Sequence, residues 1–321
     1  MRPEKIDRIA TIVILGLTGM VGLLIISLLV YILATGLPNI SWHFLTSSAE
    51  AFKSEGGIRD QLFNSLYLVV ITMIVSVPLA LCAAIYLSEY APANRLTSLL
   101  RLAIEVLSSL PSVVVGLFGY LVFVLKFGMD FSLLAGALAL TILNLPILTR
   151  SCEDALQQVP YLQRQAGLGL GMSKWRIVTK IVLPAALPGI ITGIILSAGR
   201  IFGEAAALIY TAGQSSPAID YSDWNPFSPT SFLNPMRPAE TLAVHIWKVN
   251  SEGLVPDARA VSNGSAAVLV ITILLFNLLA RYVGHLIKRR LVKWGWIKDE
   301  DSTRSKKSPS PVWWKTRGSW Y

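Results

Sequence analysis

Six long apolar blocks constrain this chain more than any other feature of its sequence. A helix needs about 20 apolar residues to cross the hydrocarbon core of a membrane. Only 15% of the 321 residues are charged and the mean hydropathy is +0.57, whereas soluble domains carry about a quarter charged residues. The sequence therefore predicts an all-α polytopic membrane protein with six transmembrane helices, near 11–36, 66–89, 103–125, 131–149, 186–212 and 266–287.

Lysine and arginine positions predict the orientation. Twenty of the 28 lie in the amino-terminal segment, in the loops after the second and fourth blocks, or beyond the sixth block, and six lie in the alternate loops. Because positively charged loops stay on the cytoplasmic side, we expect both termini in the cytoplasm. The expected order is a cytoplasmic N-terminus at 1–10, a membrane domain at 11–287 and a basic cytoplasmic tail at 288–321. For that tail we expect membrane lipid as the partner and not nucleic acid.

The chain offers little for chemistry of its own. Its three histidines and two cysteines are scattered, without metal-ligand spacing, so we expect no metal site and no catalytic site. The stretch QAGLGLGMSKWRIVTKIVLPAA (165–186) has glycines at alternate positions, and its glycine content is similar to that of a phosphate-binding loop. However, Met172 and Ser173 follow Gly171 where such a loop needs Lys and Ser or Thr. We therefore expect no nucleotide or other cofactor bound by this chain.

The same stretch is predicted to form a helix pair in a cytoplasmic loop at 150–185. One helix would start at Ser151, break at Pro160 and resume. Gly171 would supply a turn with positive φ, Ser173 would cap a short amphipathic helix, and Pro184 would end it. A helix lying on the lipid surface is one interpretation. A docking element for a cytoplasmic partner is the favoured one.

The spacing of this loop resembles that of ABC importer permeases, E-A-A-x3-G-x9-I-x-L-P. Here the chain has Gln-Ala-Gly in place of Glu-Ala-Ala, and then keeps the glycine turn and the I-x-L-P end. The resemblance implies a type I ABC importer permease fold and a loop that docks into an ATPase subunit, which would bind ATP and Mg. The docking positions are Gln165, Ala166, Gly167, Gly171, Ser173, Ile181, Leu183 and Pro184.

Three further stretches resemble the phosphate-specific transport family, and within it the PstA-type subunit. They are LPSVVVGLFGYLVFV (110–124), GRIFGEAAALIYTAG (199–213) and MRPAETLAVHIWKVNSEG (236–253). The resemblance implies a homologous permease subunit as heterodimer partner, two ATPase subunits, an extracytoplasmic phosphate-binding protein, and a bacterial or archaeal cell (inner) membrane. The last stretch lies in an outer loop at 213–265, where a short helix would start at Ala239 or Glu240.

Arg200 and Glu204 mark a candidate anion pathway in the fifth block. Four residues apart on one helix, they would lie on the same face, about 6 Å apart at Cβ. Ionisable residues within a span normally face the bundle interior or a wet pathway, and the planar fork of arginine suits phosphate. Asn144 is a third candidate for the pathway. The alternative is an Arg200–Glu204 pair that only fixes helix packing.

Two features are expected to shape the third and fourth spans. Pro111 and Pro146 would kink them, as in helices that rock during alternating access. Arg101 and Glu105, four residues apart near the inner end of the third block, would form an ion pair.

Together these patterns predict a transport subunit without a catalytic site, forming the translocation path of an ATP-driven importer for inorganic phosphate. Three alternatives remain open. The same architecture could import another oxyanion or polar solute, such as phosphonate, molybdate or sulfate. A membrane phosphotransferase could use Arg200 and Glu204, and an ion-coupled carrier could work without an ATPase.

Overall fold

The computed structural model describes residues 3–49, 56–252 and 257–293. Within these ranges the chain is helical, with one isolated bridge between Asp220 and Ser231. Its elements are α1 (Pro3–Gly36), η1 (Leu37–Asn39), α2 (Trp42–Thr46), α3 (Arg59–Ile85), η2 (Tyr86–Tyr90), α4 (Arg95–Ser108), α5 (Ser112–Gly119), η3 (Tyr120–Lys126), α6 (Leu133–Gln157), α7 (Tyr161–Gly169), α8 (Lys174–Ile177), η4 (Val178–Val182), α9 (Leu183–Phe202), α10 (Ala206–Ile209), α11 (Leu242–Glu252) and α12 (Ala258–Lys293).

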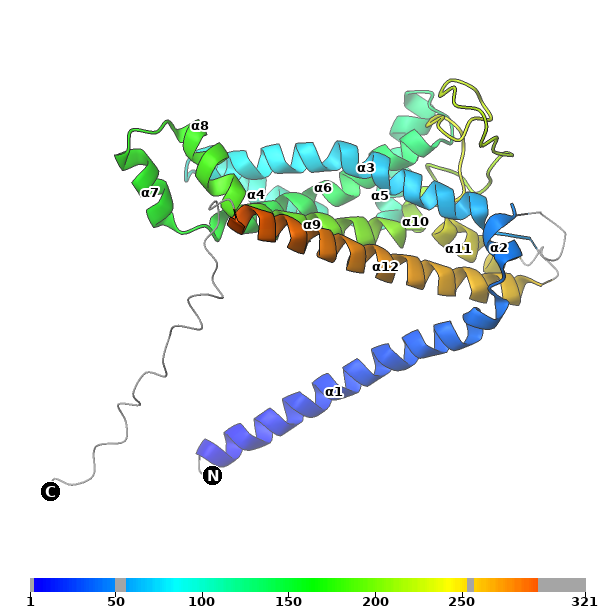
Figure 1. Cartoon of the computed structure of the whole chain (residues 1–321), viewed down its shortest axis with the longest axis horizontal. Coiled ribbons are helices and arrows are strands. Elements are labelled where there is room, and N and C mark those ends of the chain that lie inside the picture. Colours follow the sequence, from blue (N-terminus) through cyan, green and yellow to red (C-terminus); the bar gives the residue numbers. More distant parts are fainter. Residues whose placement is uncertain (1–2, 50–55, 253–256, 294–321) are drawn as a thin grey trace.

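Helices α3, α6 and α9 form the centre of a bundle, with α12 along α9 (Figure 1). Among the described residues, five helices are long and apolar enough to cross a membrane, and the bent pair α4–α5 makes a sixth if it counts as one span. The predicted inner loop and the predicted outer loops lie at opposite ends of the bundle. Helices α7 and α8 lie at the end where α12 finishes, and α2 and α11 lie at the other (Figure 1).

Helix α1 leaves the bundle and touches it only near its carboxyl end (Figure 1). A Cβ atom on Gly36 would lie 2.4 Å from the backbone oxygen of Asn263 in α12, so glycine is what allows this contact. No residue in the apolar stretch of α1 that could cross a membrane is buried in the subunit, and most of them are exposed. Its surface is therefore suited to lipid or to another membrane protein.

Helix α3 packs along α6, whose first turns are rich in small buried residues. These are Ala135, Gly136, Ala137 and Ala139. A Cβ on Gly136 would lie 2.9 Å from the side chain of Ala212 and 3.5 Å from that of Leu68 in α3. In membranes, where lipid is as apolar as a leucine side chain, such close packing replaces the hydrophobic effect as the driving force. Larger side chains then fill the space around this contact, among them Leu68, Leu133, Leu140, Phe202 and Leu208.

The third span differs from the sequence-based prediction. Instead of one helix at 103–125, α4 ends at Ser108, α5 begins at Ser112, and the two are bent by 97°. Pro111 causes the break, because it has no N–H to donate and its backbone is extended (φ −60°, ψ 136°). The predicted kink at Pro111 is thus confirmed in a stronger form. At Pro146, by contrast, α6 continues unbroken.

The fourth and fifth spans also end elsewhere than predicted. Helix α6 runs through Ser151 to Gln157, so no helix starts at Ser151 and the inner loop begins later than residue 150. The predicted fifth span at 186–212 is wrong as one helix. It stops at Phe202, and after three residues the short helix α10 follows. The break places α10 against α5, so the two interrupted spans meet each other.

The outer helix is confirmed as α11, which begins at Leu242 rather than at Ala239 or Glu240. Most of the predicted basic tail, 294–321, lies outside the described residues, as do Met1 and Arg2 of the predicted N-terminal segment.

Gly116 is expected to be essential for the packing of the two broken spans. A Cβ there would lie 2.7 Å from the Cα of Ala207, a backbone atom that cannot rotate away. We predict that Gly116→Val lowers the free energy of unfolding by about 1–3 kcal/mol or more, measured by thermal unfolding in detergent. Gly19→Val is the control, since nothing lies within 4 Å of Gly19. Equal stability of the two variants would contradict the packing described.

Candidate functional site

The three residues predicted for a pathway come together at the break in the fifth span. Asn144 of α6 lies with Arg200 and Glu204 around a small cavity, which the side chains of Leu140, Leu143 and Ile201 complete. One side of this cavity is therefore the middle of α6 and the other is the end of α9. Sequence spacing could not have placed Asn144 there, since it lies 56 residues before Arg200.

Asn144 is the most unusual polar group of this cavity. Its side chain is only 2% exposed, and neither its amide nitrogen nor its amide oxygen has a hydrogen-bond partner among the described residues. Leaving such a group unsatisfied costs about 1–3 kcal/mol. A buried amide without partners calls for an explanation, and a polar guest in the cavity would supply both a donor and an acceptor.

Arg200 and Glu204 do not form the predicted pair on one helical face. Helix α9 ends between them, and no ion pair joins these two described residues. Glu204 instead accepts a hydrogen bond from the backbone N–H of Ala207 at 3.4 Å, at the start of α10. Arg200 is exposed on the subunit surface. A charge exposed within a span must meet water or another protein rather than lipid.

The predicted helix pair is present in the inner loop. Helix α7 follows Pro160, and Gly171 has φ +73°, the left-handed conformation predicted for the turn. Gly167 is buried against the second half of the pair, where an added Cβ would lie 2.9 Å from Ile177 and 3.0 Å from Ile181. Glycine in place of the second alanine of the family pattern therefore lets the two helices pack tightly.

Ser173 and Pro184 behave differently from the prediction. Ser173 stands at the N-cap of α8, but its side chain makes no capping hydrogen bond. Pro184 does not end the helix, because α8, η4 and α9 form one continuous span from Lys174 to Phe202. The segment Val178–Val182 is a wider π turn directly before Pro184. Such a turn tolerates a residue that cannot donate a backbone hydrogen bond.

The surface of this helix pair in the inner loop carries exposed apolar side chains. Gln165 and Ala166 are exposed, Ile181 and Leu183 are half-buried, and Pro184 is buried. Around them lie large apolar residues that no part of the described chain covers: Leu162, Leu168, Leu170 and Trp175. A contiguous apolar surface on a polar loop is typical of an interaction site.

Comparisons with known proteins agree with this arrangement. Residues 76–293 match the family described as binding-protein-dependent transport system inner membrane component. The probable ABC transporter permease protein YqgI of Bacillus subtilis is 48% identical over 295 residues, which cover 91% of this chain and 99% of that protein.

The chain belongs to this family of ABC transporter permeases.

A more distant relative is the phosphate transport system permease protein PstA 2 of Mycobacterium bovis, 33% identical over 82% of each chain. Among solved structures, a bacterial alginate ABC transporter in complex with a pentasaccharide-bound periplasmic protein has a similar chain, with a TM-score of 0.61. The match covers 88% of this permease and 97% of that chain at 15% identity, so it shows the fold alone. That fold is the type I importer permease fold.

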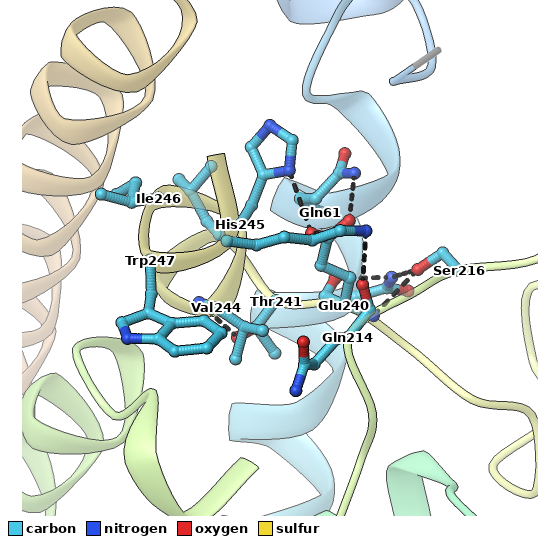
Figure 2. Close-up of polar contacts among 12 residues, drawn as sticks. Gln61, Gln214, Ser216, Glu240, Thr241, Val244, His245, Ile246 and Trp247 are labelled. Atoms are coloured by element: carbon cyan, nitrogen blue, oxygen red, sulfur yellow. Dashed lines mark hydrogen bonds and ion pairs between the residues drawn. The ribbon is translucent and has the colours of Figure 1, made fainter. Parts of the chain in front are cut away.

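A second polar cluster, which the sequence did not reveal, lies at the outer end of the permease (Figure 2). Glu240 is 4% exposed and accepts a hydrogen bond from Gln61 of α3 at 3.0 Å. His245 and Lys248 of α11 approach the same carboxylate at 3.1 and 3.8 Å. The buried Arg237 donates to Asn64 at 2.7 Å. The cluster fixes the outer loop to α3.

Burial and neighbouring polar groups shift the pKa values of Glu240 and Arg237 in this cluster. Burial raises the pKa of Glu240, but contacts with His245, Gln61 and Lys248 outweigh burial, so its pKa lies below the usual value. Burial lowers the pKa of Arg237. Sequence spacing alone could not reveal this cluster, because its members Gln61 and Glu240 are 179 residues apart.

Asn144 is expected to reduce the stability of the free permease. We predict that Asn144→Leu, a change of similar shape, raises the free energy of unfolding by about 1 kcal/mol or more, because it removes an unsatisfied buried amide. The measurement is thermal unfolding in detergent. Asn277→Leu is the control, since that amide already donates to the carbonyl of Ile273 at 2.9 Å and should not gain. A lower unfolding midpoint in Asn144→Leu would contradict the prediction.

Glu240 is expected to make the outer loop sensitive to acid. Its folded pKa is depressed, so its contribution is present above the unfolded pKa of about 4.5 and is lost as pH falls through the folded pKa. Protection factors of the α11 amides, corrected for the intrinsic pH dependence of exchange, should therefore fall in wild type below about pH 4.5. Glu240→Gln should show lower protection at neutral pH and change less on acidification. Glu252→Gln, at the exposed end of α11, is the control and should retain the wild-type profile.

Proposed function

We propose that this permease forms part of the translocation path of an ATP-driven importer for inorganic phosphate. The observation that carries the proposal is the cavity at the helix break, where the unpartnered amide of Asn144 lies with Arg200 and Glu204. A relative named as a phosphate transport permease, 33% identical over 82% of the chain, supports the choice of solute.

Each residue has a role that follows from its chemistry. The guanidinium of Arg200 donates two parallel hydrogen bonds to phosphate oxygens. Asn144 offers a donor and an acceptor, which suits a partly protonated phosphate. Glu204 offsets the positive charge, so the anion is attracted without being trapped. Interrupted helices that meet at this depth, here α5 and α10, are typical of transporter sites around which the protein rocks.

The energy for transport comes from partner chains in this proposal. Two ATPase subunits, which bind ATP and Mg, dock on the exposed apolar surface of α7 and α8. A homologous permease subunit covers Arg200 and completes the path, and an extracytoplasmic phosphate-binding protein delivers the solute at the outer face. The permease itself has no catalytic site. Its place is the cell membrane of a bacterium or archaeon, with both termini in the cytoplasm.

Another oxyanion is the second candidate, because the guanidinium of Arg200 would pair with sulfate, molybdate or phosphonate by the same contacts. Competition between these anions and phosphate separates the two. A phosphotransferase has less support. No nucleophile lies beside a base among the described residues around the cavity, which are Leu140, Leu143, Asn144, Arg200, Ile201 and Glu204.

Uptake of radiolabelled phosphate tests the proposal in a host that lacks only this subunit. We expect wild type to restore uptake and Arg200→Ala to abolish it. Arg200→Lys should retain less than about a tenth of the wild-type rate, because it keeps the charge and loses the fork. Gly171→Val should also fail, since a β-branched residue is strained at φ +73°. Arg150→Ala, at an exposed position in α6, is the control.

Two results would contradict the proposal. Full uptake by both Arg200 variants would remove Arg200 from the path. No uptake by wild type, with the partner subunits present, would mean that phosphate is the wrong solute.

A further inference from the structure

Two buried carboxylates lie side by side at the inner ends of the two central helices. Glu89 belongs to η2, the continuation of α3, and Glu153 belongs to the last part of α6. Their side chains are 7% and 6% exposed. A buried carboxylate needs a paired cation and hydrogen bonds to offset its desolvation. In both cases an arginine from a third element provides them.

Arg164 of the docking helix α7 holds the first carboxylate. Its Nη2 and Nε donate to one oxygen of Glu89 at 2.7 and 3.1 Å, and Nε also approaches the other oxygen at 3.3 Å. The same guanidinium donates to the carbonyl of Leu156 at 2.8 Å and to that of Val159. These carbonyls lie at the carboxyl end of α6, where helix carbonyls lack internal partners. One side chain thus joins α7 to both central helices.

Arg101 of α4 also joins both central helices, but its carboxylate partner is in α6 and its carbonyl partner is in η2. It pairs with Glu153 at 2.8 Å and donates to the carbonyl of Leu87 in η2 at 3.1 Å. Gln157 donates a further hydrogen bond to Glu153 at 2.9 Å. The predicted Arg101–Glu105 pair is therefore wrong, because the bend at Pro111 directs α4 across the end of α6. We call Glu89, Arg101, Glu153 and Arg164 the arginine clamp.

The clamp offers a route between the docking loop and the broken third span. The chain itself connects α7 to α9 through a turn at Gly171, where nothing lies within 4 Å of the position of a Cβ. Packing of Gly167 against Ile177 and Ile181 also joins α7 to the start of the α8–η4–α9 span, so this route reaches the fifth span but not the third. The two carboxylates of the clamp are buried and each is held by short hydrogen bonds from an arginine, so a shift of α7 pulls on the ends of α3 and α6. Arg101, whose side chain is 45% exposed, extends the connection to α4.

We propose that the arginine clamp transmits the movement of the docking helix to α3, α6 and α4. This inference rests on the proposed docking of an ATPase at α7 and α8. Arg164 acts here as a positioning residue. It immediately precedes Gln165, the first residue of the docking motif, so a displacement at the docked surface reaches its guanidinium directly. A lysine could not replace it, because a single ammonium cannot reach one carboxylate and two carbonyls in a fixed plane.

The test uses the full complex with its partner permease and ATPase in lipid nanodiscs. Hydrogen exchange is compared between the nucleotide-free and the ATP–vanadate-trapped states, which requires no transported solute. In wild type we expect nucleotide to change exchange in α7 and also in η2 and α4. In Glu89→Gln we expect the response of α7 to remain and the response of η2 and α4 to be lost. When the same complex is placed in sealed proteoliposomes with the binding protein, solute transported per ATP should fall roughly tenfold.

Three further variants keep the test decisive. Asp154→Asn is the matched control, because Asp154 neighbours Glu153 but forms an exposed pair with Arg150 at 3.9 Å; it should behave as wild type. Glu89→Gln combined with Arg164→Gln avoids a buried unpaired charge, so the complex should assemble and still lose the response of η2 and α4. Arg164→Lys should resemble Glu89→Gln. A purely structural role would reduce the amount of complex and leave transport per ATP unchanged.

The results separate the inference from the function on which it rests. If the Glu89→Gln complex keeps the wild-type response in η2 and α4, the clamp is not the route. If the wild-type complex shows no nucleotide response at α7, docking at this helix is itself wrong. If wild type responds at α7, η2 and α4, and Glu89→Gln loses the last two responses, but wild type carries no phosphate, the clamp stands and only the solute must be revised.

Discussion

The close contact between α3 and α6 is the constraint on which the rest of this permease depends. Helix α3 packs along α6 more extensively than any other pair of described elements, and the first turns of α6 are rich in small buried residues. Three other features are arranged around this pair. The interrupted spans pack on the middle of α6, the outer loop is fixed to one end of α3, and the docking helix is fixed to the other ends of both. A rigid central pair thus connects three sites that bind different partners in the proposed importer.

Much of this architecture could be predicted from the sequence. Long apolar blocks indicate membrane helices whatever their neighbours are, because the cost of a polar backbone in lipid is set by the lipid. The glycine turn at Gly171 and the outer helix at α11 follow from local rules, since positive φ and helix periodicity are properties of short segments. The structure brings Arg200, Glu204 and Asn144 together around one cavity, and their role in a pathway stays a prediction.

The errors have a common physical origin. The sequence predicts kinks at Pro111 and Pro146 and a helix end at Pro184, yet the helix is broken only at Pro111. What happens at a proline depends on whether neighbouring turns and helices can satisfy the freed carbonyls, which is a tertiary property. The ion pairs failed for a related reason. Sequence spacing reveals partners three or four residues apart, whereas Arg164 and Glu89 are separated by 75 residues.

The exposed position of Arg200 has a consequence for the biosynthesis of the transporter. A newly inserted permease that has not met its partner must keep this cation beside lipid, and the surface of α1 is uncovered in the same bilayer. The orphan subunit is therefore the less stable species, and assembly removes the penalty. Such a subunit is a natural target for membrane proteases, so the stoichiometry of the two permease chains can be set after translation by degradation of the surplus. The residue proposed to attract the solute would then also report whether the complex is complete.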